Sequence, residues 1–175
     1  TLQAVDYSFS HPSPWEIVNA GYIGVIRYLG WDFGQGPRCI SQAEHDALRA
    51  AGLAVDLVWE TNADMVLRGA AGGARDGAEA ARLCRLLHHD HPIYVAIDFD
   101  ISPGQQAIAD QYLAAFREAW LAEFYGKYDV IEHAGTGWQC CAWSGIGWGS
   151  GGTNQGRRLS EDARMYQLLG YGLNN

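Results

Sequence analysis

The chain has 175 residues, of which 48% are hydrophobic and 18% are charged, a length and composition that suit one globular domain and exclude a disordered or fibrous protein. The formal net charge is -8, which argues against nucleic acid or an anionic membrane surface as the main partner, because both attract clusters of lysine and arginine. The sequence contains no run of about 18 apolar residues, so we expect no membrane-spanning helix.

Strand-like and helical patterns alternate in the first third of the chain. Ser13 is placed to cap a short helix whose first position is Pro14. Ser41 and Glu44 have the spacing of a capping box at the start of a second helix, and Gly52 is a typical helix stop. Strands are expected at residues 3–8, 22–30 and 53–60.

The same alternation continues in the rest of the chain. The glycine-rich segment "GAAGGARDG" predicts a loop that leads into a helix from about Asp76 to Leu87. Apolar residues at helical spacing predict a helix within "SPGQQAIADQYLAAFREAW", and a short helix is expected within "KYDVIEHAG". Strands are expected at residues 92–100, 121–126, 138–144 and 163–171.

The order of these elements indicates the fold class. Strands that alternate with helices form parallel βαβ units, which build either an open doubly wound sheet or a barrel. No GxGxxG or GxxxxGK[ST] motif follows the first strand, which argues against a nucleotide-dependent enzyme with an open sheet. We therefore predict an α/β fold of the compact TIM-like (β/α) barrel type, formed by a single domain over residues 1–175.

Two aspartates, Asp98 and Asp100, end the stretch "PIYVAIDFD". Side chains alternate along a strand, so both aspartates would point to one face. One explanation is an edge strand whose polar face meets water. A functional site is the other explanation, because Asp6 and Glu60 also lie near expected strand ends, and the carboxyl ends of parallel barrel strands open on one rim. We predict that all four carboxylates converge at the barrel mouth.

Arg27 and Gln167 are placed by the same alternation to face the interior near these acids. An arginine lowers the pKa of some neighbouring carboxyl groups, while their mutual repulsion raises the pKa of others. Acids that differ in this way can divide the roles of general acid and charge stabiliser, as in glycoside hydrolysis. A structural alternative is an ion pair of buried Arg27 with Asp6 or Asp98 that only closes the barrel.

Aromatic residues lie at or just after the expected strand ends, where rings can stack on the apolar faces of sugars. Trp59 is expected to pack outward under a helix, because it alternates with Val55 and Leu57. The candidates for substrate contact are Tyr7, Trp31, Tyr125, Trp143 and Trp148.

Neither the cysteines nor the histidines indicate a metal site. Cys39, Cys84, Cys140 and Cys141 have no CxxC spacing, so we expect buried free thiols. The segment "HHDH", which begins at His88, resembles a metal-binding cluster. It follows a helical pattern directly, however, and fits the C-terminus of a helix, where a histidine interacts favourably with the helix dipole. We predict no metal and no organic cofactor.

The chain also resembles a known family. The segments "VDYS", "GVIRYLG", "SQAEHDALRAAGL", "LVWE", "YVAIDFD", "FYGKYDVIEHA" and "WQCCAWS" occur in the order found in the glycoside-hydrolase-like domains of actinobacteria and their phages, which are distant relatives of the family 25 muramidases. The resemblance covers the chain from about Gln3 to Gln167. It implies a compact (β/α) barrel, a site around Asp6, Glu60, Asp98 and Asp100, and peptidoglycan or a related cell-envelope glycan as the ligand.

Two departures from the family pattern bear on activity. The muramidase pattern ends its fourth strand with Asp-x-Glu, whereas "DFD" puts Asp100 where the glutamate acid would stand, with a side chain shorter by one methylene. Glu60 is an alternative acid. The family usually has a last strand carrying "VDxD", and the chain stops before it, so we expect a barrel that is open or completed by residues outside this chain.

The leading hypothesis is a peptidoglycan hydrolase of the endolysin or muramidase-like type. An alternative is a catalytically inactive barrel that binds wall glycan and positions a partner catalytic module. The resemblance implies a setting in phage lysis or secretion to the cell wall, beside other modules of one polypeptide. The chain lacks an initiator Met and a signal peptide and stops at Asn175, so we expect a module excised from a longer chain.

Overall fold

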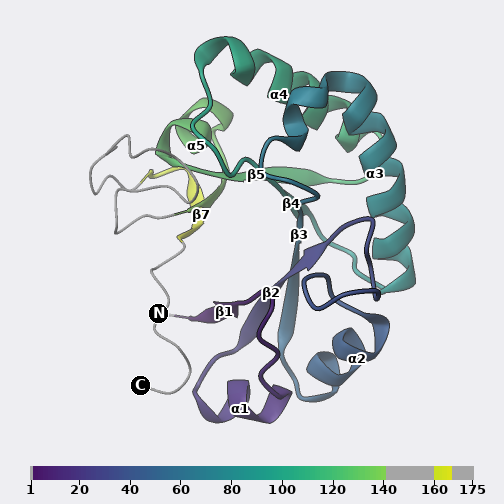
Figure 1. Ribbon diagram of the computed structural model, residues 1–175. Coiled ribbons are helices and arrows are strands. Elements are labelled where there is room, and N and C mark those ends of the chain that lie inside the picture. Colours follow the sequence, from purple (N-terminus) through teal and green to yellow (C-terminus); the bar gives the residue numbers. More distant parts are fainter. Residues whose placement is uncertain (1, 141–159, 167–175) are drawn as a thin grey trace. The chain divides into compact units, whose positions relative to one another are not determined.

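The computed structural model describes residues 2–140 and 160–166, and Figure 1 shows its strands and helices. The chain divides into two compact units, the first reaching to Trp59 and the second running from Glu60 to Gly170. Both units have the same construction, in which parallel strands follow one another in chain order and helices connect them.

The first unit contains a parallel sheet in the order β1-β2-β3. Val25 of the central strand pairs with Val5 on one side and with Val55 on the other. Such β-branched residues favour strands, and those of β2 and β3 are buried. The elements of this unit are β1 (Ala4–Asp6), α1 (Pro14–Asn19), β2 (Gly24–Leu29), α2 (Gln42–Ala50) and β3 (Ala54–Trp59).

The predicted helix starts of the first unit are confirmed, with one difference. Ser13 forms a complete capping box with Glu16 at α1, and Pro14 occupies the first turn. Ser41 caps α2 by accepting a hydrogen bond from the backbone N–H of Glu44 at 3.1 Å. The Glu44 carboxylate accepts hydrogen bonds from Arg27, although the sequence predicted that it would complete the cap. A buried guanidinium needs a charged partner, and this requirement outweighs the cap.

The second unit contains a parallel sheet in the order β4-β5-β6-β7. Ser102 caps its helix α4 in a capping box with Gln105. The elements of this unit are the 3-10 helix η1 (Met65–Arg68), α3 (Gly69–Leu86), β4 (Ile93–Ala96), α4 (Pro103–Arg117), β5 (Ala122–Gly126), α5 (Tyr128–Ala134), β6 (Gly137–Gln139) and β7 (Ala163–Tyr166).

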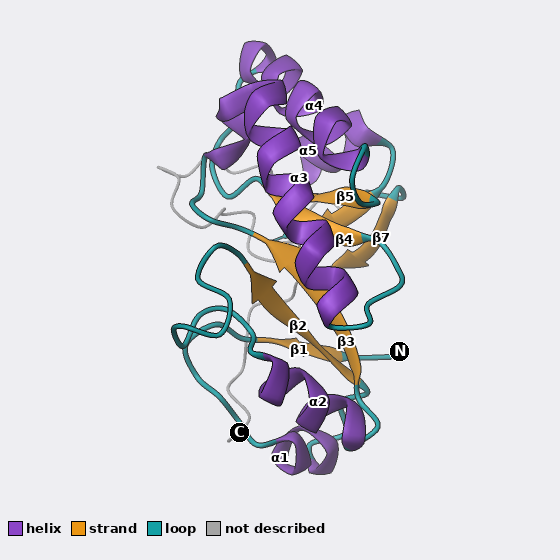
Figure 2. Cartoon of the chain, turned by 90° about the vertical axis from the view of Figure 1, so that its right-hand side faces the viewer, coloured by secondary structure: helices purple, strands orange, loops and turns teal. Residues whose placement is uncertain are grey.

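The prediction of a loop over "GAAGGARDG" is wrong, because this segment forms the first half of α3. Its glycines allow close packing against α4, which lies beside α3 in Figure 2. A Cβ atom at Gly73 would lie 2.0 Å from the carbonyl oxygen of Tyr112, and one at Gly77 would lie 2.7 Å from that of Phe116. The glycine content therefore reflects helix packing and not a loop.

Strand β4 is shorter than predicted and ends at Ala96. The backbone N–H of Ile97 still donates to the carbonyl oxygen of Tyr125 at 2.8 Å, but Asp98 and Asp100 lie in the segment that follows the strand. The argument that strand alternation points both aspartates to one face is therefore wrong. Strand β6 confirms the predicted strand up to Gln139, while Cys140 already lies beyond it. Strand β7 confirms the predicted strand over its described residues.

The structure confirms the predicted α/β fold with the strand-helix succession of a TIM-like barrel. Strands β1 to β6 alternate with helices along the chain, and every described strand pairing is parallel. Among the described residues, none of the helices combines the length and hydrophobicity that a membrane span requires.

Candidate functional site

Two of the predicted carboxylates are carried by neighbouring segments of the second unit. Glu60 follows the last residue of β3 and is 9% exposed. Asp98 is half-buried, and its backbone N–H donates to the carbonyl oxygen of Ala63 at 3.3 Å. This hydrogen bond joins the segment after β4 to the segment after Glu60. The structure therefore brings the chain segments that bear Glu60 and Asp98 together.

Asp100 forms an ion pair with Lys127, the residue that follows β5. The Lys127 side chain is 7% exposed and that of Asp100 is 34% exposed. A buried ammonium group requires a negative partner, and the pair stabilises the charged forms of both side chains. Lys127 thus favours the carboxylate form of Asp100. The sequence analysis did not predict this role, although a lysine directly after the strand pattern "AEFYG" was the available signal.

Tyr125, a predicted substrate contact, lies near the end of β5 and is buried. Its ring centroid is 4.4 Å from that of Trp138 on the neighbouring strand β6. Trp138 also contacts Tyr94 of β4, with ring centroids 5.6 Å apart. Tyr125 is therefore part of an aromatic cluster on the sheet of the second unit.

The remaining predicted acid, Asp6, is the last residue of β1 in the first unit and is half-buried. Tyr7 follows it and donates a hydrogen bond from its hydroxyl to Oε1 of Glu44 at 3.0 Å. Burial raises the pKa of Tyr7 well above its usual value, and the negative charge of Glu44 adds to this rise. Tyr7 is therefore a neutral hydrogen-bond donor at physiological pH.

Arg27 is fully buried in β2 and is held by a network within the first unit. Its Nε donates to Oε1 of Glu44 at 2.7 Å and its Nη2 to Oε2 at 3.2 Å. Its Nη1 donates to the carbonyl oxygens of Tyr7 at 2.6 Å and Arg38 at 3.1 Å. The guanidinium also lies 4.4 Å from the centroid of the Tyr7 ring. Glu44, which the sequence analysis assigned only to a cap, is thus the acid that binds Arg27.

Among the predicted aromatic contacts that the structure describes, Trp31 is the one left open to solvent, with 48% of its surface exposed. Its ring meets the fully buried Trp59 edge to face, with centroids 6.2 Å apart. Three further predicted residues, Trp143, Trp148 and Gln167, lie outside the described residues.

The histidine and cysteine predictions can be compared with the described part of the chain. His88 has a left-handed backbone conformation, with φ of 54°, just after α3, which confirms the predicted helix end. Cys39, Cys84 and Cys140 are buried free thiols, as predicted, and Cys141 lies outside the described residues. The described residues contain no group of three or more His, Cys, Asp or Glu side chains placed to hold a metal ion.

The chemistry available after β3 and β4 is that of carboxyl groups in different surroundings. Glu60 is buried, Asp98 is half-buried, and Asp100 is fixed by a lysine. Such differences allow one carboxyl group to donate a proton while another remains ionised.

Comparison with known proteins gives a family and a structural relative. A family model described as "Rv2525c-like, glycoside hydrolase-like domain" matches residues 15–168. Crystal structures of the Mycobacterium tuberculosis Tat-secreted protein Rv2525c, in complex with L-tartrate or with HEPES, are similar with a TM-score of 0.75. The sequence identity is 21%, and the alignment covers 93% of this chain and 84% or 85% of that chain. No curated protein matches.

Proposed function

Because the chain belongs to the Rv2525c-like family of glycoside hydrolase-like domains, we propose that it hydrolyses a cell-wall glycan, with peptidoglycan as the substrate. The observation that carries this proposal is the set of acids after two successive strands, in which Glu60 is buried and Asp100 is paired with Lys127. Glycoside hydrolysis needs carboxyl groups that differ in their tendency to hold a proton.

We assign the general acid to Glu60. A general acid must carry a proton when the substrate binds, and burial of a carboxyl group favours its protonated form. Glu60 is 9% exposed and follows the fully buried Trp59. Asp100 is less suited to this role, because its ion pair with Lys127 favours the ionised form.

Asp98 and Asp100 then act as carboxylates. One of them stabilises the positive charge that develops on the sugar ring, and the other orients the N-acetyl group of the substrate. A mechanism in which the substrate's own N-acetyl group attacks needs no enzymatic nucleophile. It therefore does not require a fixed distance between two acids.

For the residues of the first unit, the proposed roles in the site are based on their positions in the sequence. Asp6 is the last residue of a strand, which is where an acid at a barrel mouth would lie. We propose that it also stabilises the positive charge that develops on the sugar ring. Trp31 has the exposure that sugar stacking needs. For the buried Arg27 we propose a supporting role, in which it holds Tyr7 and Glu44. Tyr125, Trp143 and Gln167 remain proposed substrate contacts.

The proposal is tested by release of reducing sugar from purified mycobacterial-type peptidoglycan. We expect hydrolysis by the wild type, a loss of at least about a hundredfold in kcat for Glu60→Gln and a comparable loss for Asp98→Asn. The matched controls are Glu79→Gln, a residue of α3 whose carboxylate pairs with the exposed Arg82, and Asp46→Asn, an exposed residue of α2. Loss of activity in the controls, or full activity of folded Glu60→Gln, would refute the assignment.

The second candidate function is a wall-binding module without catalysis. The observation that favours it is the Lys127–Asp100 pair, because Asp100 stands where the muramidase pattern has its glutamate acid and is held here by a lysine. The same experiment separates the two functions. If the wild type and all variants pellet with peptidoglycan and none releases sugar, the chain is a binding module.

We also propose that the chain acts outside the cytoplasm, where peptidoglycan lies. Its structural relative Rv2525c is a Tat-secreted protein, and this supports a secreted location. Delivery during phage lysis, as a module of an endolysin, is the other route we propose. The sequence of the complete natural polypeptide, with either a leader segment or further lytic modules, tells these two routes apart.

A further inference from the structure

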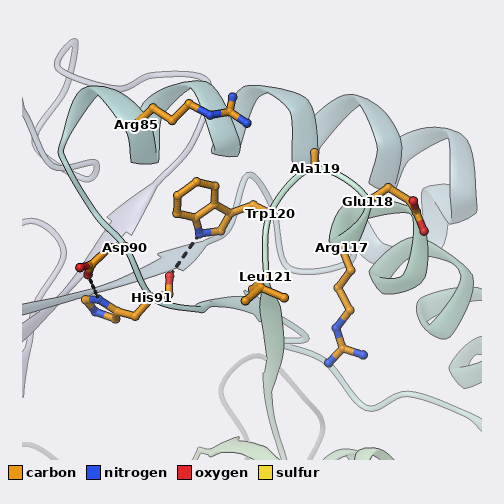
Figure 3. A pocket seen from close by; sticks show the side chains of 8 residues that line it. All are labelled: Arg85, Asp90, His91, Arg117, Glu118, Ala119, Trp120 and Leu121. Atoms are coloured by element: carbon orange, nitrogen blue, oxygen red, sulfur yellow. Dashed lines mark hydrogen bonds and ion pairs between the residues drawn. The ribbon is translucent and has the colours of Figure 1, made fainter.

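A pocket of about 290 Å³ lies at the beginning of strands β4 and β5 (Figure 3). It is formed by the end of α3, the segment before β4, and the segment between α4 and β5. The residues on which the inference depends are Arg85, Asp90, Arg117, Glu118 and Trp120.

This pocket is distinct from the proposed catalytic carboxylates of the same unit. Asp90 precedes β4 and Trp120 precedes β5, whereas Asp98 and Lys127 follow these strands. The two strands are parallel, so the pocket and the carboxylates belong to opposite ends of one sheet. A ligand in the pocket would not contact the reacting bond.

Trp120 presents a ring surface inside the pocket. Its indole Nε1 donates a hydrogen bond to the carbonyl oxygen of His91 at 3.2 Å, which fixes the ring plane. The guanidinium of Arg85 lies 5.9 Å from the ring centroid, near the outer limit of a cation–π contact, and Figure 3 shows it on one side of the ring. The side chain is half-buried, so part of the ring remains accessible.

Polar groups of both kinds line the same pocket as Trp120. Arg117 uses its Nε to donate to the carbonyl oxygen of Ala122 at 2.7 Å, and no described contact engages its two terminal nitrogens. Likewise, no described contact engages the carboxylate of Glu118. The lining holds two arginines, Arg85 and Arg117, and two acids, Asp90 and Glu118, and Asp90 is already paired with His91 at 3.1 Å. The formal charges of the arginines and acids are equal in number, so the lining favours a neutral ligand that both donates and accepts hydrogen bonds.

We propose that this pocket is a second sugar-binding site, which holds one N-acetylhexosamine unit of a neutral glycan chain. The apolar face of the sugar stacks on Trp120, its hydroxyl groups donate to Glu118, and its hydroxyl or acetamido oxygens accept from Arg117. A volume of about 290 Å³ is at the lower limit for ligand pockets and suits a single ring. The inference takes the ligand class from the proposed function, and such a site would hold a wall glycan strand while a second strand is cleaved.

The test is a titration of the Glu60→Gln variant with the β-1,4-linked tetramer of N-acetylglucosamine, followed by NMR of the indole N–H groups. The Trp120 signal is identified by its absence in Trp120→Phe. We expect this signal to shift with the tetramer, and Glu118→Ala to weaken the affinity by about tenfold. Trp15→Phe, which changes an exposed tryptophan of the first unit, should leave the shift unchanged.

No shift of the Trp120 signal at millimolar tetramer, or equal affinity of the Glu118→Ala variant and its parent, would overturn the inference. Glu118 is exposed and has no described partner, so its replacement leaves folding intact. The readout is binding at one indole and does not depend on hydrolysis. If the wild type releases no sugar but the Trp120 signal shifts, the proposed activity fails and the second site stands.

Discussion

Arg27 and Glu44 form a two-point ion pair, with Nε to Oε1 at 2.7 Å and Nη2 to Oε2 at 3.2 Å, although the Arg27 side chain is completely buried. Loss of the partner of a buried charge leaves that charge without compensation. We expect Glu44→Gln to lower the free energy of unfolding by about 3 kcal/mol, measured by urea denaturation. Asp46→Asn on the same helix is the control, because Asp46 is 63% exposed, and equal effects of the two changes would contradict the structural role of the pair.

The glycines of α3 give a prediction opposite to that from helix propensity alone. Alanine is favoured over glycine in a helix by about 1 kcal/mol, yet a Cβ at Gly73 would lie 2.0 Å from a carbonyl oxygen of α4. We expect Gly73→Ala to destabilise the protein by about 2 kcal/mol or more, because the two helices must separate. Gly104→Ala is the control, since a Cβ there has no atom within 4 Å. It should be neutral or stabilising in the same thermal unfolding measurement, and stabilisation by Gly73→Ala would contradict the packing role.

These two cases show what the sequence could and could not predict about the fold. Local signals were sufficient for the helix starts at Ser13 and Ser41, because a cap depends on residues a few positions apart. They were insufficient for the start of α3, because the reason for its glycines is the backbone of a helix about 40 residues later in the sequence. The partner of Glu44 was missed for the same reason.

The buried thiols give a prediction about chemical reactivity. Burial raises the pKa of Cys84 to about 12, and burial together with the hydrogen bond to Asp32 raises the pKa of Cys39 to about 12. Both thiols are then protonated at pH 8, and the thiolate is the reactive form. We expect neither cysteine to react with a thiol reagent in the folded protein and both to react in urea, as determined by peptide mass spectrometry. Rapid labelling of Cys84 in the folded state would contradict its burial.

The same pKa difference predicts how stability changes with pH. The folded-state pKa of Cys84 lies above the value of about 8.5 for a free thiol, so the unfolded chain loses this proton first as the pH rises. The contribution of Cys84 to stability is therefore complete below pH 8.5 and decreases as the pH rises toward 12. We expect the free energy of unfolding to fall between pH 8 and pH 10, and Cys84→Ala to show a smaller fall. An identical fall in the free energy of unfolding of the wild type and of Cys84→Ala would contradict the raised pKa of Cys84.

Sequence reasoning about the site succeeded in placing acids at strand ends and failed in describing their surroundings. Glu60 and Asp98 follow β3 and β4, as predicted from parallel strands. The directions in which the side chains of Asp98 and Asp100 point could not be predicted from the alternation of side chains along a strand, because β4 ends before these residues. The lysine that pairs with Asp100 was not predicted, because it follows a different strand and contact between strand ends is a property of the sheet.

The Lys127–Asp100 pair predicts a measurable coupling energy in the second unit. Lys127→Met leaves the Asp100 charge without its partner, and Asp100→Asn leaves a buried ammonium group. We expect each change to lower the free energy of unfolding by about 1–3 kcal/mol and the double variant to lose about 1 kcal/mol less than the sum. The Arg82 and Glu79 pair of α3 is the control, because the Arg82 side chain is 60% exposed whereas that of Lys127 is 7% exposed, and a coupling below about 0.5 kcal/mol is expected. Equal coupling in both pairs would contradict the importance of burial.

Kinetics of the same variants test whether the pair serves catalysis or only stability. If Lys127 acts by keeping Asp100 ionised, both single variants lose the same group, and the double variant has the same kcat on peptidoglycan as either single variant. If the two residues act separately on the substrate, their effects multiply. A third result, a kcat unchanged in every folded variant, assigns the pair to stability alone. Because Glu60 and Asp98 are unchanged in all three variants, that result leaves their proposed roles in place and limits the catalytic acids to them and Asp6.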